Sequence, residues 1–127
     1  MAGYSGTPLP QKLGIKDGSR VRLQGAPDGF ARTIGVDRRS RGEADVIVFF
    51  APNAARLRGE FARLKKSLHP AGGLWIAWPK KSSGVATDLT ENEVRNLGLS
   101  LGLVDNKVCA IDDTWSGLRF VIRLADR

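Results

Sequence analysis

The clearest pattern in the chain is a pair of short runs in which nearly every position is apolar. Residues 44–51 read ADVIVFFA and residues 74–78 read LWIAW, without the alternation of a half-buried strand. A strand with apolar side chains on both faces is covered on both faces, as in the centre of a parallel sheet. Each run is followed by a proline, which has no N–H to donate to a sheet ladder. The pattern therefore predicts two central strands.

Two other segments have the spacing of helices. Asn53 is a residue type favoured at the N-cap, and a helix is predicted from residue 54 onward. The apolar positions of this helix recur at i, i+4, i+7 and i+11, namely Leu57, Phe61, Leu64 and Leu68. Thr90 and Glu93 have the spacing of a capping box, which predicts a second helix that ends at Gly102. Its buried stripe consists of Val94, Leu97 and Leu101.

The remaining elements have weaker patterns. Val21 and Leu23 alternate with polar residues, which predicts a first strand over residues 19–25, near an edge of the sheet. A short helical piece is predicted near Asp28 and a short strand over residues 34–38. Residues 105–112 and 117–124 are predicted as two strands. Because only four residues join them, they form an antiparallel hairpin.

This order of elements predicts the fold class. Strands that alternate with helices form a parallel sheet with right-handed crossovers. We therefore expect an α/β protein with a three-layer, Rossmann-like sheet of about five strands, mostly parallel, with a C-terminal antiparallel hairpin. Residues 1–12 show no periodicity and are predicted to be a flexible N-terminal tail. Residues 13–127 are expected to form a single domain, because 42% of the 127 residues are hydrophobic and can supply a core.

The net charge of +7 is unevenly distributed along the chain. Residues 1–81 hold 15 Lys and Arg against 6 Asp and Glu, whereas residues 86–113 are mainly acidic. Five basic residues occupy the outer positions of the first predicted helix: Arg56, Arg58, Arg63, Lys65 and Lys66. Such a surface attracts nucleic acid electrostatically, so weak and non-specific binding is expected. The simpler interpretation is a solvated basic face.

Cysteine and histidine are nearly absent, which limits the chemistry. A single cysteine, Cys109, excludes an intramolecular disulfide and a cysteine-cluster metal site. His69 is the only histidine, and its position favours an interaction with the end of the preceding helix. We assign no catalytic residue and no metal ligand. The chain begins without a secretory signal and lacks a run of about 18 apolar residues, so a cytoplasmic protein without membrane contact is expected.

A candidate binding site follows from the expected direction of the strands. The loops after the strands that end before Gly25, Pro52, Pro79 and Asp113 should share one rim, and open α/β sheets bind ligands at the carboxyl ends of their strands. The predicted ligand-binding residues are Gly25, Asp28, Gly29, Lys80, Lys81, Ser82, Ser83 and Trp115. Ammonium groups, hydroxyls and loop N–H groups suit an anionic small molecule, and a protein partner is the alternative. Trp115 either stacks on a ligand or folds back over the sheet edge.

Three phrases resemble the class I S-adenosylmethionine-dependent methyltransferases. LHPAGGLWI, at residues 68–76, resembles the approach to the fifth strand of that family, and DVIV, at residues 45–48, resembles its fourth strand. LGIKDGSRV, at residues 13–21, resembles the approach to its first strand. The resemblance implies a methyltransferase-like fold and makes S-adenosylmethionine a candidate cofactor.

The chain departs from that family where the cofactor would bind. Members of the family follow the first strand with a glycine-rich turn, whereas this chain has only Gly25 and Gly29 there. They also hold the ribose with an acidic residue at the end of the second strand. Between Pro27 and Glu43 there is no room for that strand and its helices. The cofactor half is largely deleted, so we expect no bound cofactor.

A closer resemblance spans nearly the whole chain. LGIKDG, VRLQGAP, GGLWIAWPKKSSG and DDTWSGLRFV resemble a family of small bacterial proteins known as domain of unknown function 3052. This resemblance implies a small bacterial cytosolic protein and supplies no activity. A non-catalytic binding or regulatory module on a truncated methyltransferase-like scaffold is the favoured hypothesis. A minimal methyltransferase that needs a partner comes second, and a weak electrostatic nucleic-acid binder third.

Overall fold

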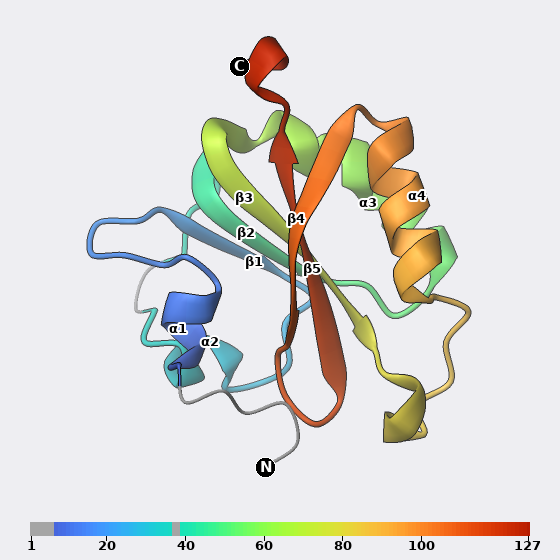
Figure 1. Cartoon of the computed structure of the whole chain (residues 1–127). Coiled ribbons are helices and arrows are strands. Elements are labelled where there is room, and N and C mark those ends of the chain that lie inside the picture. Colours follow the sequence, from blue (N-terminus) through green and yellow to red (C-terminus); the bar gives the residue numbers. More distant parts are fainter. Residues whose placement is uncertain (1–6, 37–38) are drawn as a thin grey trace.

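The computed structural model describes residues 7–36 and 39–127, which form a five-stranded sheet with helices packed against it (Figure 1). The strands are β1 (Val21–Gln24), β2 (Ala44–Phe50), β3 (Leu68–Pro79), β4 (Leu103–Ala110) and β5 (Trp115–Ile122). The helices are α1 (Leu9–Lys12), α2 (Phe30–Thr33), α3 (Ala54–Lys66) and α4 (Glu91–Ser100). Two 3-10 turns lie at Lys81–Ser83 and Leu124–Asp126.

The strand order is β1-β2-β3-β5-β4, which makes β3 the central strand. β1, β2 and β3 pair in parallel, whereas β5 is antiparallel to both β3 and β4. β4 therefore runs in the same direction as β1, β2 and β3. β3 is covered on both faces, because its successive residues Trp75 and Ile76 point to opposite faces and both are 0% exposed. The predicted α/β class, the five strands, the parallel start and the closing hairpin are confirmed.

Both long helices begin where their caps predicted. Asn53 Oδ1 accepts a hydrogen bond from Arg56 N at 2.9 Å, and Thr90 Oγ1 accepts one from Glu93 N at 3.2 Å. These side chains satisfy N–H groups that have no partner within the first turn of a helix. The expected helix starts are therefore confirmed.

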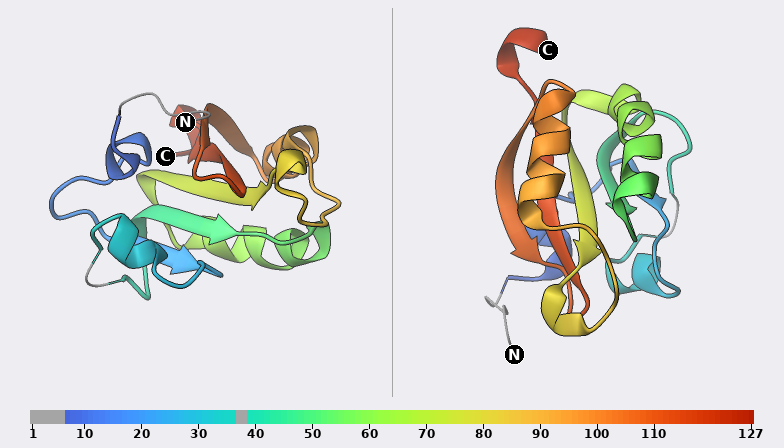
Figure 2. Two further views of the ribbon diagram at one scale, coloured as in Figure 1. Left: turned by 90° about the horizontal axis from the view of Figure 1, so that it is seen from below. Right: turned by 90° about the vertical axis from the view of Figure 1, so that its right-hand side faces the viewer.

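α3 and α4 lie on the same face of the sheet (Figure 2). The core on this face includes Phe49, Leu57, Phe61, Leu64, Val94 and Phe120. α4 packs closely against β5 because Gly98 has no side chain, and a Cβ at that position would lie 2.1 Å from the ring of Phe120. This contact fixes the distance between the helix and the sheet.

The opposite face is covered by short segments. α1 and α2, of four residues each, lie on this side with the loops around them (Figure 1). Leu13, Phe30 and Ile34 pack there against the sheet, and Trp75 Nε1 donates a hydrogen bond to Leu13 O at 3.0 Å. The expected three-layer arrangement is not confirmed, because residues 25–43 between β1 and β2 are too few to supply long helices.

Two sets of predicted boundaries and one predicted strand differ from the structure. Leu68 is the first residue of β3 and pairs with Ala44, whereas its spacing had assigned it to the helix. The hairpin strands begin two residues earlier than predicted, because Asp112 Oδ1 accepts hydrogen bonds at 2.8 Å from the N–H groups of both Thr114 and Trp115 and closes the turn there. Residues 34–36 form a turn and an irregular stretch instead of a strand, and residues 37–38 of that expected strand lie outside the described residues.

The predicted N-terminal tail contains a helical turn. Residues 9–12 form α1, and Lys107 Nζ donates a hydrogen bond to Lys12 O at 2.8 Å. Leu13, which follows α1, is 0% exposed. Residues 1–6 lie outside the described residues. The flexibility of residues 1–12 and the boundary between a tail and a single domain at residues 13–127 stay predictions.

Candidate functional site

The loops that follow β1, β2, β3 and β4 open at one edge of the sheet, because these four strands run in the same direction. We call this edge the carboxyl rim and define it as residues 25–29, 51–53, 80–84 and 111–114. The 3-10 turn after β3 and the β4–β5 turn lie at the same end of the molecule in Figure 1. The rim therefore contains seven of the eight predicted ligand-binding residues, and the eighth, Trp115, follows it as the first residue of β5.

The loop after β1 packs against the end of β2. Gly25 has a φ of +67°, and a Cβ at this position would lie 3.0 Å from Phe50 O. Both facts favour glycine at this position. Gly29, with a φ of +83°, begins α2, and Asp28 between them is exposed. Both glycines thus allow the positive φ angles of this loop, and Gly25 also allows the loop to pack closely against the end of β2.

The loop after β3 uses one of its two hydroxyls internally. Lys80 N donates a hydrogen bond to Thr114 O at 2.8 Å, which ties this loop to the hairpin. Ser83 Oγ donates to Lys80 O at 2.6 Å and accepts from Val85 N at 3.2 Å, so it stabilises the 3-10 turn. Among the described residues, the side chains of Lys80, Lys81 and Ser82 have no hydrogen-bond or ion-pair partner. These three groups are available to a ligand.

The start of α3 is occupied by side chains of the chain itself. Asp88 Oδ1 accepts a hydrogen bond from Ala54 N at 2.8 Å, and Asn53 Oδ1 accepts one from Arg56 N in the same first turn. Thr87 Oγ1 donates to Pro52 O at 2.9 Å. The segment between β3 and α4 is therefore tied to the loop after β2. The free N–H groups with which a helix start attracts an anion are partly satisfied here.

Trp115 is half-buried and packs on β2. Its ring meets that of Phe50 edge-on, with centroids 5.1 Å apart and an interplanar angle of 89°. Phe50 in turn meets Phe30 of α2 at 4.8 Å and 76°. Of the two positions predicted for this indole, the structure places it back against the sheet, in an aromatic cluster of Phe30, Phe50 and Trp115.

A small cavity lies between the loop after β1 and the hairpin. Its volume is about 140 Å³, and its lining includes Pro27, Asp28, Phe30, Ile111 and Asp112. Its polar lining includes two carboxylates, Asp28 and Asp112, and none of the rim lysines. The structure therefore brings Asp28 close to the hairpin, but the cavity does not join Asp28 to Lys80 and Lys81.

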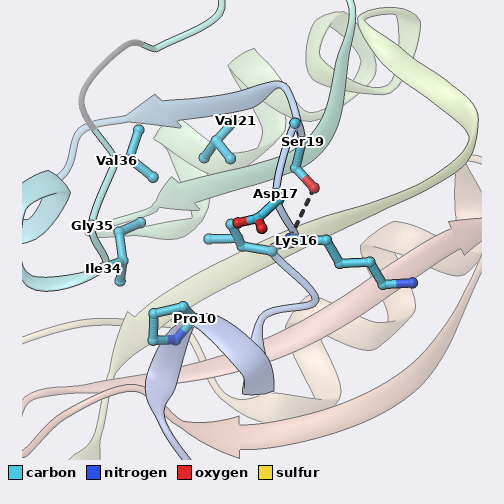
Figure 3. Close-up of a pocket in the computed structure, with 10 residues that line it drawn as sticks. Pro10, Lys16, Asp17, Ser19, Val21, Ile34, Gly35 and Val36 are labelled. Carbon is cyan, nitrogen blue, oxygen red and sulfur yellow. Dashed lines mark hydrogen bonds between the residues drawn. The ribbon is translucent and has the colours of Figure 1, made fainter.

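A larger cavity lies at the other end of β1, and no feature of the sequence indicated it. Its volume is about 320 Å³, and its lining combines polar residues of the loop before β1 with apolar residues such as Val21 of β1 and Ile34 after α2. Figure 3 shows Asp17 and Ser19 at this cavity, while the Lys16 side chain points away from the other labelled residues. Lys16 N donates a hydrogen bond to Ser19 Oγ at 2.9 Å, so the hydroxyl serves the local turn.

The basic face of α3 is partly used within the protein. Arg63 pairs with Glu60, and Lys65 Nζ donates a hydrogen bond to Leu101 O at 2.5 Å, at the end of α4. Arg56, Arg58 and Lys66 are exposed. Among the described residues, these three cations have no ion-pair partner, fewer than the five that the sequence indicated.

The single histidine and cysteine lie within strands. His69 is in β3, and its Nδ1 accepts a hydrogen bond from Ala71 N at 3.1 Å, not one involving the end of α3 as expected. Burial raises the pKa of the half-buried Cys109 thiol, which favours the neutral form. No cluster of three His, Cys, Asp or Glu side chains suited to a metal occurs in residues 7–36 and 39–127. Within the same residues, no helix has the length and apolar character needed to cross a membrane.

The fold is similar to that of two methyltransferase-related structures. One, described as a DhpI–SAH complex, matches with a TM-score of 0.56 and 13% identity over 94% of this chain and 72% of that chain. The other is a ribosomal protein L11 methylase from Lactobacillus delbrueckii subsp. bulgaricus, with a TM-score of 0.52 and 12% identity. That match covers 84% of this chain but only 59% of the methylase.

These similarities concern the fold, because the identities are low. The methyltransferase-like fold implied by the sequence phrases is confirmed. No protein-family model and no curated protein sequence matches the chain. The resemblance to domain of unknown function 3052, the bacterial origin and the ligand-binding role of the predicted rim residues therefore stay predictions.

Proposed function

We propose that this protein is a non-catalytic binding module built on a methyltransferase-like scaffold. The observation that carries the proposal is the structure of the carboxyl rim beside β1. Ligand pockets usually have volumes of about 300–1,000 Å³. The cavity next to residues 25–29 measures about 140 Å³, and its walls include Phe30 of the aromatic cluster.

The residues at this position do not fit S-adenosylmethionine. The Cβ position of Gly25, which in a glycine-rich turn would leave space for a ligand, lies 3.0 Å from Phe50 O. The ring of Phe50 is in turn packed edge-on against Trp115. The nearest carboxylate in this loop, Asp28, is exposed and follows β1 itself, whereas the ribose-binding acid of the family follows the second strand. We therefore infer that the isolated chain does not bind S-adenosylmethionine at this position.

The rim still offers cations to a binding partner. Lys80, Lys81 and Ser82 lie on a turn that is closed by the hydrogen bond from Ser83 Oγ to Lys80 O and tied to the hairpin by the one from Lys80 N to Thr114 O. Cations on a fixed turn bind an anionic group at a lower entropic cost than cations on a mobile loop. We infer that the partner of this module is an anionic small molecule or an acidic segment of a protein.

The alternative function is a minimal methyltransferase whose site is completed by a partner subunit. The similarity to an SAH complex over 94% of this chain favours it. Isothermal titration calorimetry with S-adenosylmethionine and with S-adenosylhomocysteine separates the two proposals. We expect no heat of binding with the isolated chain. Binding at micromolar concentrations would contradict the non-catalytic proposal and support the alternative.

A further inference from the structure

Arg119 of β5 occupies an unusual position on the face of the sheet that α1 and α2 cover. It pairs with Trp75 of β3 on one side and with Lys107 of β4 on the other. Its half-buried guanidinium lies directly over Gly73. A Cβ at Gly73 would lie 2.3 Å from Arg119 Nε and 2.6 Å from Cζ. The absence of a side chain at Gly73 therefore creates the space that the guanidinium fills.

The guanidinium of Arg119 has no carboxylate partner in residues 7–36 and 39–127. Within the described part of the chain, its guanidinium donates one hydrogen bond, from Nη1 to Asn106 Oδ1 at 3.3 Å. Arg20 and Arg95 differ, because each of them pairs with two acidic side chains. A guanidinium has five N–H donors, so most of those on Arg119 have no partner in the described protein.

The surroundings of Arg119 add positive charge. Lys107 lies directly opposite Arg119 on β4. Its ammonium donates a hydrogen bond to Lys12 O, a backbone carbonyl, so Lys107 adds a positive charge near Arg119 without an acidic partner. Burial lowers the pKa of the Arg119 guanidinium, and the charge of Arg127 lowers it further. A partly buried cation loses hydration, and that cost is recovered only when an opposite charge is close. The folded chain supplies no such charge among its described residues.

We propose that Arg119 is the anchor of a second binding site, which takes the carboxylate or phosphate group of a small anionic ligand. The planar fork of a guanidinium binds both kinds of oxyanion through two parallel hydrogen bonds. Asn106 Oδ1 accepts a hydrogen bond from one side of the guanidinium, and Gly73 on β3 leaves the space in which the guanidinium lies. The site is separate from the carboxyl rim: Gly73 and Pro79 are six residues apart along β3, a distance of about 20 Å in a strand.

The test is thermal unfolding, followed by circular dichroism, in inorganic phosphate and in succinate at constant ionic strength. The two anions distinguish a phosphate ligand from a carboxylate ligand. At an anion concentration about ten times the dissociation constant, the wild-type melting temperature should rise by about 4 °C in at least one of the two anions. No rise in either anion at tens of millimolar would overturn the proposal.

Two variants test the geometry. Arg119→Met keeps the aliphatic stem and removes the charge, and it should abolish the rise. Gly73→Ala keeps the charge but displaces the flexible end of Arg119, and it should also abolish the rise. Arg123→Met removes an exposed cation just after β5 and should leave the response unchanged. A rise retained in Arg119→Met, or lost equally in Arg123→Met, would contradict an anchor at Arg119.

The melting temperatures of the variants without added anion supply a second measurement. Because Arg119 lacks a counter-charge, Arg119→Met should melt at or above the wild-type temperature in the absence of added anion. Should Arg119→Met fail to fold, Arg119→Lys decides the matter, since it keeps the charge, loses the fork and should bind the anion at least several-fold more weakly. Equal binding by Arg119→Lys would contradict recognition by the fork. None of these measurements involves S-adenosylmethionine, so their failure is distinguishable from failure of the proposed function.

Discussion

The contact between Phe50 and Trp115 contributes to holding the hairpin at the carboxyl rim, together with the pairing of β5 with β3. The ring centroids are 5.1 Å apart in an edge-on arrangement, and such pairs contribute about 0.5–1.5 kcal/mol beyond the area they bury. Emptying a fully buried aromatic site costs about 3–5 kcal/mol. Trp115 is half-buried, so we expect Trp115→Ala to lower the free energy of unfolding by about 2 kcal/mol, roughly half of that cost.

Urea unfolding followed by far-ultraviolet circular dichroism measures this loss without relying on tryptophan fluorescence. With a slope of about 1–3 kcal/mol per molar urea, the midpoint should fall by about 1 M. Trp78→Ala is the reference, because Trp78 is 6% exposed and its loss should cost about twice as much. A double-mutant cycle of Phe50→Leu and Trp115→Ala isolates the ring contact, with an expected coupling of about 0.5–1.5 kcal/mol.

Each outcome has a separate meaning for the indole. A coupling energy of zero would refute the contact between the two rings. An unchanged midpoint in Trp115→Ala would show that the indole contributes nothing to the fold, which would favour its role as a ligand platform. A midpoint as low as that of Trp78→Ala would instead make the indole a full member of the core.

Two further predictions concern a helix glycine and an ion pair. Gly98→Ala places a Cβ against the Phe120 ring, so it should lower the free energy of unfolding, measured in urea, by about 1–3 kcal/mol. Gly59→Ala is the control, because a Cβ there meets nothing within 4 Å, and it should raise this free energy by about 0.5–1 kcal/mol. The reverse order would contradict the packing of α4. The Arg20 guanidinium and backbone N–H hold the pKa of Asp45 below its usual value, so the resulting stability is complete above the unfolded pKa of about 3.9 and is lost as the pH falls through the folded pKa. Arg20→Gln should therefore reduce the loss of stability measured on acidification below about pH 4, and an unchanged pH dependence would refute the role of the pair.

The elements that depend on local spacing could be predicted from the sequence. The apolar runs gave β2 and the centre of β3, and the caps gave the starts of α3 and α4. Leu68 shows the limit of such spacing, because a residue at i+11 of a helical stripe can equally begin the next strand. It begins β3 because Ser67 ends α3 and Leu68 pairs with Ala44. Only the tertiary pairing decides between the two.

The candidate site could be predicted in position but not in chemistry. The common direction of four strands follows from the order of the elements, so the carboxyl rim was predictable. Whether a polar side chain is free depends on contacts between distant segments, such as Asp88 with Ala54 and Lys65 with Leu101. Arg119 gave no signal, because in the sequence it is one of two polar positions in the predicted strand over residues 117–124, and neither is marked by a motif.

The two glycines at residues 72 and 73 resemble the methyltransferases in sequence, but their roles in this structure concern packing and not a cofactor. In the sequence it belongs to the phrase that resembles the methyltransferases. In the structure each glycine has a local reason: a Cβ at Gly72 would lie 2.5 Å from Asp45 O, and one at Gly73 would lie 2.3 Å from Arg119 Nε. The first allows β3 to approach β2 where their register shifts, and the second makes room for a guanidinium. Neither reason involves a cofactor, and Gly73 lies about 20 Å along β3 from the carboxyl rim. The phrase therefore supports the fold, whereas methyl transfer needs evidence from the rim itself.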